Sequence, residues 1–153
     1  MLSQKTKYAL KASLALARHY GQGPVLISQL AQQEGIPKKF LELILLELKN
    51  NAILGSKKGK GGGYFLNHAP GEVTFGQIIR IMEGPLAPLP CVSRSAYRRC
   101  EECRDESYCE LRLVMKEVRD ATAQVLDHTS LGDALERAMA AQIKGLDILD
   151  FDI

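Results

Sequence analysis

Residues 27–66 read ISQLAQQEGIPKKFLELILLELKNNAILGSKKGKGGGYFL, and this stretch decides the fold. The pattern of residues 28–34 predicts a short helix that ends at Gly35, because glycine readily takes the left-handed conformation that closes a helix. Pro37 marks the first turn of a second helix, where its missing N–H costs nothing. The apolar positions of that helix recur at helical spacing and predict one buried stripe, made of Leu41, Ile44, Leu45 and Leu48. Two short helices joined by a tight turn predict a helix-turn-helix.

The second helix is expected to enter the major groove of duplex DNA, with its N-terminal residues first. Lys38, Lys39 and Glu42 fall on the face away from the buried stripe, so they are free to touch a partner.

A basic hairpin is predicted directly after this helix. Residues 52–57 and 64–66 have the pattern of two short strands, and the Gly- and Lys-rich tip between them requires positive φ. The alternatives are a plain flexible turn or the phosphate loop of a nucleotide enzyme, but that loop requires Gly-Lys followed by Ser or Thr, which is absent from this stretch. We interpret the hairpin as a wing that follows DNA phosphates. The candidate DNA-binding residues are Lys5, Lys38, Lys39, Glu42, Lys57, Lys58, Lys60 and Tyr64.

The distribution of charge agrees with this interpretation. The whole chain of 153 residues has a net charge of +2, but residues 1–60 carry +7 and residues 61–153 carry −5. A basic N-terminal portion suits contact with phosphates. No apolar run approaches the ~20 residues of a membrane span, and no signal-peptide core is present at the N-terminus. A cytoplasmic location is therefore expected.

The remaining chain predicts helices with a break between them. An amphipathic helix is expected over residues 3–20 with Ser3 as its N-cap, and another after Thr74. Prolines at 85, 88 and 90 interrupt regular structure and predict a domain boundary at these residues.

From Glu110 a helix of about five turns carries an apolar stripe. A dimer partner is expected to bury this stripe; the alternative is that it packs onto its own domain. Thr129 is expected to cap a last helix over residues 131–143, and the tail from Gly145 is expected to be loose.

The predicted fold class is mainly α with a small β-hairpin wing. We expect a winged helix-turn-helix over residues 1–84, a cysteine-rich sensor loop over 85–109, and a dimerisation helix and C-terminal helix over 110–144.

The four cysteines lie within nineteen residues, at Cys91, Cys100, Cys103 and Cys109. Clustered thiols in a reducing compartment indicate a metal site or a redox site more than structural disulfides. Zinc knuckles usually have two close cysteine pairs, whereas iron–sulfur ligation tolerates irregular spacing better. An iron–sulfur cluster, [2Fe-2S] or [4Fe-4S], is favoured, with a thiol switch and a zinc site as the alternatives. The arginines around the loop would offset the negative charge of thiolates.

By its motifs the chain resembles the IscR/NsrR/CymR (Rrf-two) family of winged helix-turn-helix transcriptional regulators. The matching pieces are Lys7-Tyr8-Ala9-Leu10, Phe40-Leu41-Glu42, Leu45-x-x-Leu48-Lys49, the wing Ser56-x-Lys58-Gly59-x-Gly61-Gly62-Gly63-Tyr64-x-Leu66, and Thr129-x-Leu131-x-Asp133. The resemblance implies a homodimer that crosses through its long helices (residues 111–126), with the second helix in the major groove and the wing in the minor groove. It also implies that Glu42 reads cytosine.

The chain departs from the family pattern at several positions. Lys58 stands where arginine is usual, and Leu43 and Leu46 are apolar where relatives more often carry polar or small groups. Sensor members hold an iron–sulfur cluster on three cysteines of a C-x5-C-x5-C type. Cys103 and Cys109 keep one such interval and Cys91 stands at the first position, but the gap from Cys91 to Cys103 is longer and Cys100 is extra. Arg112 replaces a histidine that completes the site in the iron–sulfur assembly regulator, and arginine cannot ligate. Cys100 is therefore the candidate fourth ligand.

The sequence thus predicts a dimeric DNA-binding regulator whose operator affinity is controlled by an iron–sulfur cluster that senses redox state, iron or nitric oxide. A thiol-switch regulator and a zinc-stabilised DNA-binding protein are the alternatives. An enzyme is not expected, because a Cys-x-x-Cys oxidoreductase would require an alternating strand–helix pattern, and this sequence lacks one.

Overall fold

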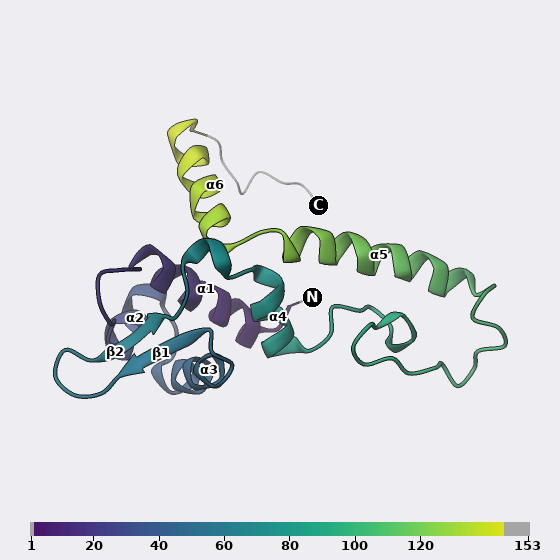
Figure 1. The fold of residues 1–153 in the computed structure, drawn as a ribbon, viewed down its shortest axis with the longest axis horizontal. Coiled ribbons are helices and arrows are strands. Elements are labelled where there is room, and N and C mark those ends of the chain that lie inside the picture. Colours follow the sequence, from purple (N-terminus) through teal and green to yellow (C-terminus); the bar gives the residue numbers. More distant parts are fainter. Residues whose placement is uncertain (1, 146–153) are drawn as a thin grey trace.

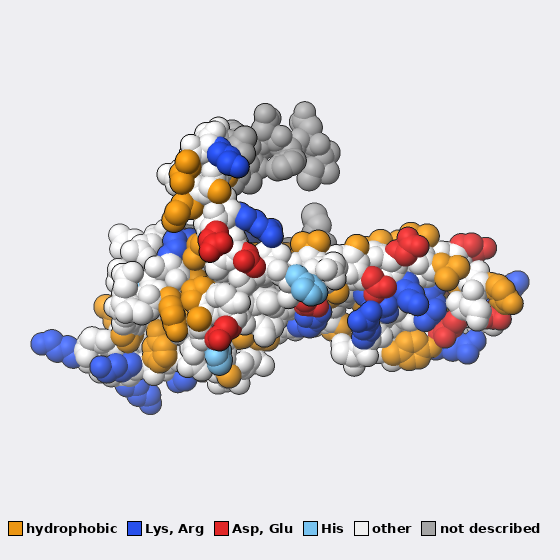
Figure 2. Space-filling model, turned by 45° about the horizontal axis from the view of Figure 1, so that its top comes forward, with side chains coloured by type: hydrophobic (Ala, Val, Ile, Leu, Met, Phe, Trp, Pro, Cys, Tyr) orange, Lys and Arg blue, Asp and Glu red, His pale blue; other side chains and the backbone are white. Residues whose placement is uncertain are grey.

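The structure, a computed structural model, describes residues 2–145, so the tail predicted from Gly145 lies almost entirely outside the described residues. It is mainly helical with one antiparallel hairpin, as predicted. An N-terminal domain (residues 4–83) packs into a rounded body. The arm (residues 84–127), which is an irregular loop followed by a long helix, extends to one side of it, and α6 begins in the core of the body, where Leu131 is fully buried, before it projects away (Figures 1 and 2). The elements are α1 Gln4–Arg18, α2 Ile27–Glu34, α3 Lys38–Asn50, β1 Leu54–Lys57, β2 Gly63–Leu66, α4 Phe75–Glu83, α5 Glu110–Asp127 and α6 Leu131–Ile143, with 3-10 turns η1 Pro70–Glu72 and η2 Pro90–Val92.

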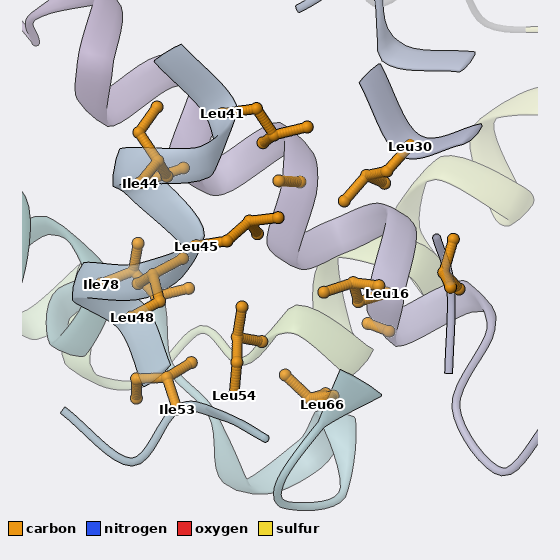
Figure 3. Packing of buried hydrophobic residues seen from close by; sticks show 14 of the residues in the cluster. Leu16, Leu30, Leu41, Ile44, Leu45, Leu48, Ile53, Leu54, Leu66 and Ile78 are labelled. Atoms are coloured by element: carbon orange, nitrogen blue, oxygen red, sulfur yellow. The ribbon is translucent and has the colours of Figure 1, made fainter. Parts of the chain in front are cut away.

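The helix-turn-helix forms as the sequence predicted. Gly35 closes α2 in the left-handed conformation, with φ of 65°, and Pro37 stands immediately before α3. The predicted stripe of α3 is completely buried. Figure 3 shows these side chains directed at apolar residues of α1, α2, the hairpin and α4. The buried stripe therefore fixes which face of α3 turns outward.

The wing is attached to the domain by its backbone. Leu54 pairs with Leu66 and Lys57 with Gly63, and Val25 and Tyr64 exchange two N–H···O bonds of 2.8 Å. The first strand begins at Leu54 rather than at residue 52, because Ala52 has φ of 62° and belongs to the turn. A Cβ atom at Gly63 would lie 2.2 Å from the Val25 carbonyl oxygen, so only glycine allows this close approach. The base of the wing is consequently held in a fixed place beside α3.

The junction between α5 and α6 is pinned to the start of α4. Phe75 N donates to Thr129 O at 3.0 Å, and Leu131 N donates to Val73 O at 2.8 Å. This junction also contains the N-cap of α6, where the prediction that Thr129 caps the last helix was wrong. Ser130 caps it and forms a capping box with Asp133, while the Thr129 hydroxyl donates back to Val125 O.

The N-caps of two earlier helices were predicted correctly. The Ser3 hydroxyl accepts from Thr6 N at the start of α1, and the Thr74 hydroxyl accepts from Gln77 N at the start of α4. Both helices therefore begin where the sequence placed them.

The arm is built differently from the domain. The loop over residues 91–109 is irregular, as predicted, and runs back along α5 (Figure 1). Although α5 has 18 residues, it has no buried residue. No helix within residues 2–145 combines the length and apolar character that crossing a membrane demands.

Candidate nucleic-acid interface and cysteine site

The outward face of α3 carries charged side chains that are open to a partner. Lys38, Lys39 and Glu42 are exposed, on the side opposite the buried stripe. They stand in the first turns of the helix, so they would lead if α3 entered a groove.

The wing places further cations next to α3. Lys57, Lys58 and Lys60 are exposed at the end of β1 and in the tip, and β1 packs against α3. Figure 2 shows Lys and Arg side chains protruding at the end of the domain that lies away from the arm. Gly59 and Gly61 have φ of 88° and 75°, as expected for the tip. The geometry brings these three lysines and the α3 residues to one region of the surface.

The other two candidates, Lys5 and Tyr64, already make contacts within the protein. The Lys5 ammonium lies 2.6 Å from a Glu47 carboxylate oxygen, which ties α1 to α3. Tyr64 is half-buried against the core, and its backbone is held by Val25.

Two apolar side chains occupy the centre of the outward face of α3. Leu43 is 65% exposed and Leu46 is 48% exposed. They follow Lys39 at spacings of four and seven residues, which places all three on one side of the helix. The predicted buried stripe is the signal that could have revealed their exposure, because it leaves positions 43 and 46 on the outward face.

The four cysteines gather around the start of α5 without touching. Cys91 is buried in η2, Cys103 and Cys109 are half-buried, and Cys100 is exposed. Cys109 is the N-cap of α5, and its Sγ accepts from Arg112 N at 3.4 Å. All four line one open hollow of about 600 Å³. Within residues 2–145, however, no three His, Cys, Asp or Glu side chains come close enough to hold a metal ion.

Arginines are among the residues that line this hollow. Arg104 and Arg112 line it, and Arg98 and Arg99 line an adjoining hollow together with Cys91, Cys100 and Cys109. Glu102, Asp105 and Glu110 also line the first hollow, so side chains of both charges lie around the thiols. That the arginines offset the charge of thiolates stays a prediction.

Two arginines of α5 hold the Cys91 segment, a role that the sequence analysis missed. Arg112 Nε donates to Cys91 O at 3.3 Å, and Arg119 Nη1 donates to Val92 O at 2.7 Å. Arg119 also donates to Asp120 and thereby lowers the pKa of that carboxyl. The spacing of seven residues between the two arginines, which puts them on one face of a helix, is the signal that could have revealed the pair.

A further ion pair joins the arm to the domain. Arg80 of α4 donates to both carboxylate oxygens of Asp127, at 2.5 and 2.9 Å, and lowers the pKa of Asp127. A Cβ atom at Gly76 would lie 2.0 Å from Asp127 Oδ1, so the pair passes directly over this glycine.

The rest of α5 presents an apolar face to solvent. Its exposed large apolar residues are Leu111, Leu113, Val114, Val118 and Val125, and α6 exposes Met139 and Ile143. Figure 2 shows hydrophobic side chains along one edge of the arm. The predicted stripe is present, and within the described chain nothing buries it.

Comparison with known proteins agrees with this architecture. Residues 2–137 match the family model described as Rrf2, iron-dependent transcriptional regulator. A helix-turn-helix regulator of Rhodobacter capsulatus described as rrf2-like is 44% identical over 138 residues, which are 88% of this chain and 92% of the relative. CymR of Bacillus subtilis is 33% identical over 132 residues, covering 86% and 87% of the two chains. Its solved structure superposes with a TM-score of 0.74 over 90% of this chain and 97% of CymR. The solved structure of T. potens IscR, which is 28% identical, superposes with a TM-score of 0.74 over 93% of this chain and 90% of IscR. The chain therefore belongs to the Rrf2 family of transcriptional regulators, which bind DNA and are not enzymes.

Proposed function

We propose that this regulator binds its operator as a homodimer through α3 and the wing, and that an iron–sulfur cluster in the cysteine loop controls its affinity. The observation that carries the proposal is that all four cysteines line one hollow beside the start of α5, with Arg104 and Arg112 among its other lining residues. The description of the matching family as iron-dependent supports it.

The DNA contacts are proposed from charge and exposure. Lys38 and Lys39 would lead α3 into the major groove, and Glu42 is chemically able to accept from the exocyclic amine of cytosine. Lys58 and Lys60 would reach phosphates beside the groove, where lysine acts as a point charge without the planar fork of arginine.

Charge reversal tests this placement. The double variant Lys38→Glu/Lys39→Glu should abolish operator binding in a titration by fluorescence anisotropy, while Arg137→Glu/Lys144→Glu, which reverses two exposed cations of the C-terminal region, should leave it nearly unchanged. Lys58→Ala and Lys60→Ala should weaken all sequences alike and flatten the salt dependence by about one unit of slope per lost phosphate contact. Unchanged affinity of the double variant would show that α3 does not enter the groove.

The cysteine loop fits an iron–sulfur cluster by its donor set and its surroundings. Cys91, Cys103 and Cys109 would hold the cluster, and Cys100 is the candidate fourth ligand. Because the four thiols line one hollow without meeting, the loop has to draw together for ligation. When bound, the cluster would supply an iron centre sensitive to oxidation and to small ligands.

The ties from this loop to α5 support a route to the DNA-binding domain. Arg112 and Arg119 fasten the Cys91 segment to α5, and α5 is joined to α4 by the Arg80–Asp127 pair. Ordering of the loop would bias the direction of α5 and, in a dimer, the separation of the two α3 helices. Such couplings typically amount to about 1–3 kcal/mol, or about 5–150-fold in affinity.

Metal analysis tests the cluster. The wild-type protein and four single Cys→Ser variants should be purified without oxygen, and iron, sulfide and zinc measured per monomer, with Ser95→Ala as a control in the same loop. Equal loss of iron in all four variants supports an all-cysteine site, and loss in only three removes Cys100 from it. Zinc in place of iron, or no metal in the wild type, would contradict the proposal.

A thiol switch is the second candidate, favoured by a specific observation. Cys100 is exposed and forms a tight turn with Cys103, whose N–H donates to the Cys100 carbonyl at 3.1 Å. CymR, one of the relatives, is described as the global cysteine regulator of B. subtilis. A metal-free wild-type protein that forms an intramolecular disulfide on mild oxidation, with a matching change in DNA affinity, would favour this function.

A further inference from the structure

We infer that Leu43 and Leu46 read thymine methyl groups in the operator. The inference rests on the proposed entry of α3 into the major groove and adds the chemistry that the centre of its face can recognise. Leu43 and Leu46 lie on the face opposite the buried residues Leu41, Ile44, Leu45 and Leu48, between the lysines of the first turn and Lys49 of the last.

The exposure of these leucines has no explanation within the described chain. Leu43 keeps 65% and Leu46 48% of its surface accessible, on a helix whose opposite face is completely buried. One exposed leucine needs no explanation, but two lie one turn apart at the middle of the face predicted to meet DNA.

The chemistry of the groove identifies the occupant. The C5-methyl of thymine is the apolar group that the base edges of the major groove present, and apolar side chains recognise it by contact. The charge around the pair favours nucleic acid as the partner, because α3 itself carries exposed Lys38, Lys39 and Lys49, and the wing that follows it in the chain carries exposed Lys57, Lys58 and Lys60. A leucine at position 43 makes no hydrogen bond, so it distinguishes thymine from cytosine and uracil by the methyl group alone.

The experiment compares thymine with uracil, which lacks only that methyl. A site is first selected from random duplex DNA with the full-length protein, and each thymine of one half-site is then replaced by uracil, one at a time. Removing a contacted methyl should weaken binding about fourfold, as expected for one buried methyl group. In Leu43→Ala or Leu46→Ala the same replacement should lose its effect, while Lys49→Ala should weaken both duplexes equally and retain the difference.

The outcomes separate this inference from the proposed function. If Lys38→Glu/Lys39→Glu abolishes binding but no uracil replacement matters, α3 enters the groove and the methyl reading is overturned. If the charge reversals also have no effect, both proposals fail together. Unchanged DNA affinity in both leucine variants would overturn the inference. Circular dichroism should show that both alanine variants, which alter exposed side chains, remain folded.

Discussion

The helices α3 and α5 carry similar apolar patterns, but the apolar stripe is buried in α3 and exposed in α5. The stripe of α3 is completely buried by α1, α2, the hairpin and α4, whereas α5, which is five residues longer, has no buried residue. A helical period therefore predicts that a stripe exists but not what covers it. The N-terminal domain supplies its own cover, and we propose that the arm takes its cover from a second copy of the chain.

The largest expected effect lies in the domain. Leu45→Ala removes a fully buried side chain and should lower the free energy of unfolding by about 2–5 kcal/mol, through lost burial and the cavity left behind. Urea denaturation followed by circular dichroism measures the change. Val114→Ala on α5 is the matched control and should change the unfolding of dilute, monomeric protein by less than about 0.5 kcal/mol. Equal losses in the two variants would remove the contrast.

The next effect concerns the cover of α5. Val118→Asp places a charge in the middle of the exposed stripe and should give monomers in sedimentation velocity, because apolar burial contributes on the order of 25 cal/mol per Å² before association costs are subtracted. Lys116→Asp, an exposed neighbour, should remain dimeric. A stable Val118→Asp dimer would show that the interface lies elsewhere.

A smaller effect is expected where the arm holds its own loop. Arg119→Ala removes the donor to Val92 O, a charge-assisted hydrogen bond of the kind worth about 1.5–3 kcal/mol. In metal-free protein the buried Cys91 should then be alkylated at least about tenfold faster, as followed by peptide mass spectrometry. Arg94→Ala, which removes only a link to Asp120, should leave the rate unchanged. A similar rate in both variants would mean that the loop is held by other contacts.

The smallest effect tests how the end of α4 is tied to the start of α1. Hydrogen bonds from the Ser3 side chain, the Thr6 hydroxyl and Ser3 N, in that order of importance, lower the pKa of Glu83 to about 2. A lowered pKa in the folded state stabilises the protein above the ordinary value of 4.5, and this contribution is lost as the pH falls toward 2. Glu83→Gln should therefore flatten the acid dependence of the melting temperature in this window. The exposed Glu136→Gln should retain it, and parallel curves for wild type and Glu83→Gln would contradict the assignment.

The domain was predictable because its boundaries carry chemical markers. Gly35 supplies the left-handed closure of α2, Pro37 precedes α3, and Thr74 caps α4, so the order of elements follows from the sequence. The start of the last helix could not be predicted from such markers. Thr129 and Ser130 both carry hydroxyls able to cap, and only the backbone conformation decides that Ser130 does so.

The candidate sites were predictable to different depths. The outward position of Lys38, Lys39 and Glu42 follows from the stripe, because exposure on a helix is the complement of burial. The cysteine loop is neither an α-helix nor a strand, so the sequence spacing of its cysteines does not predict where their side chains lie. Its sequence therefore indicated a shared site, but not that Cys91 would be buried, Cys100 exposed, or both held apart around one hollow.

Backbone hydrogen bonds join Val73 to Leu131 and Phe75 to Thr129, so the C-terminal end of α5 is fixed to the domain while its N-terminal end lies away from it. The 18 residues of α5 span about 27 Å at 1.5 Å per residue, so a tilt of about 5° moves the far end by about 2 Å. The cysteine loop ends at this far end of α5, where a given tilt of the helix produces the largest displacement. In the mechanism we propose, a small closure of the loop would therefore turn α5 about its junction with the domain.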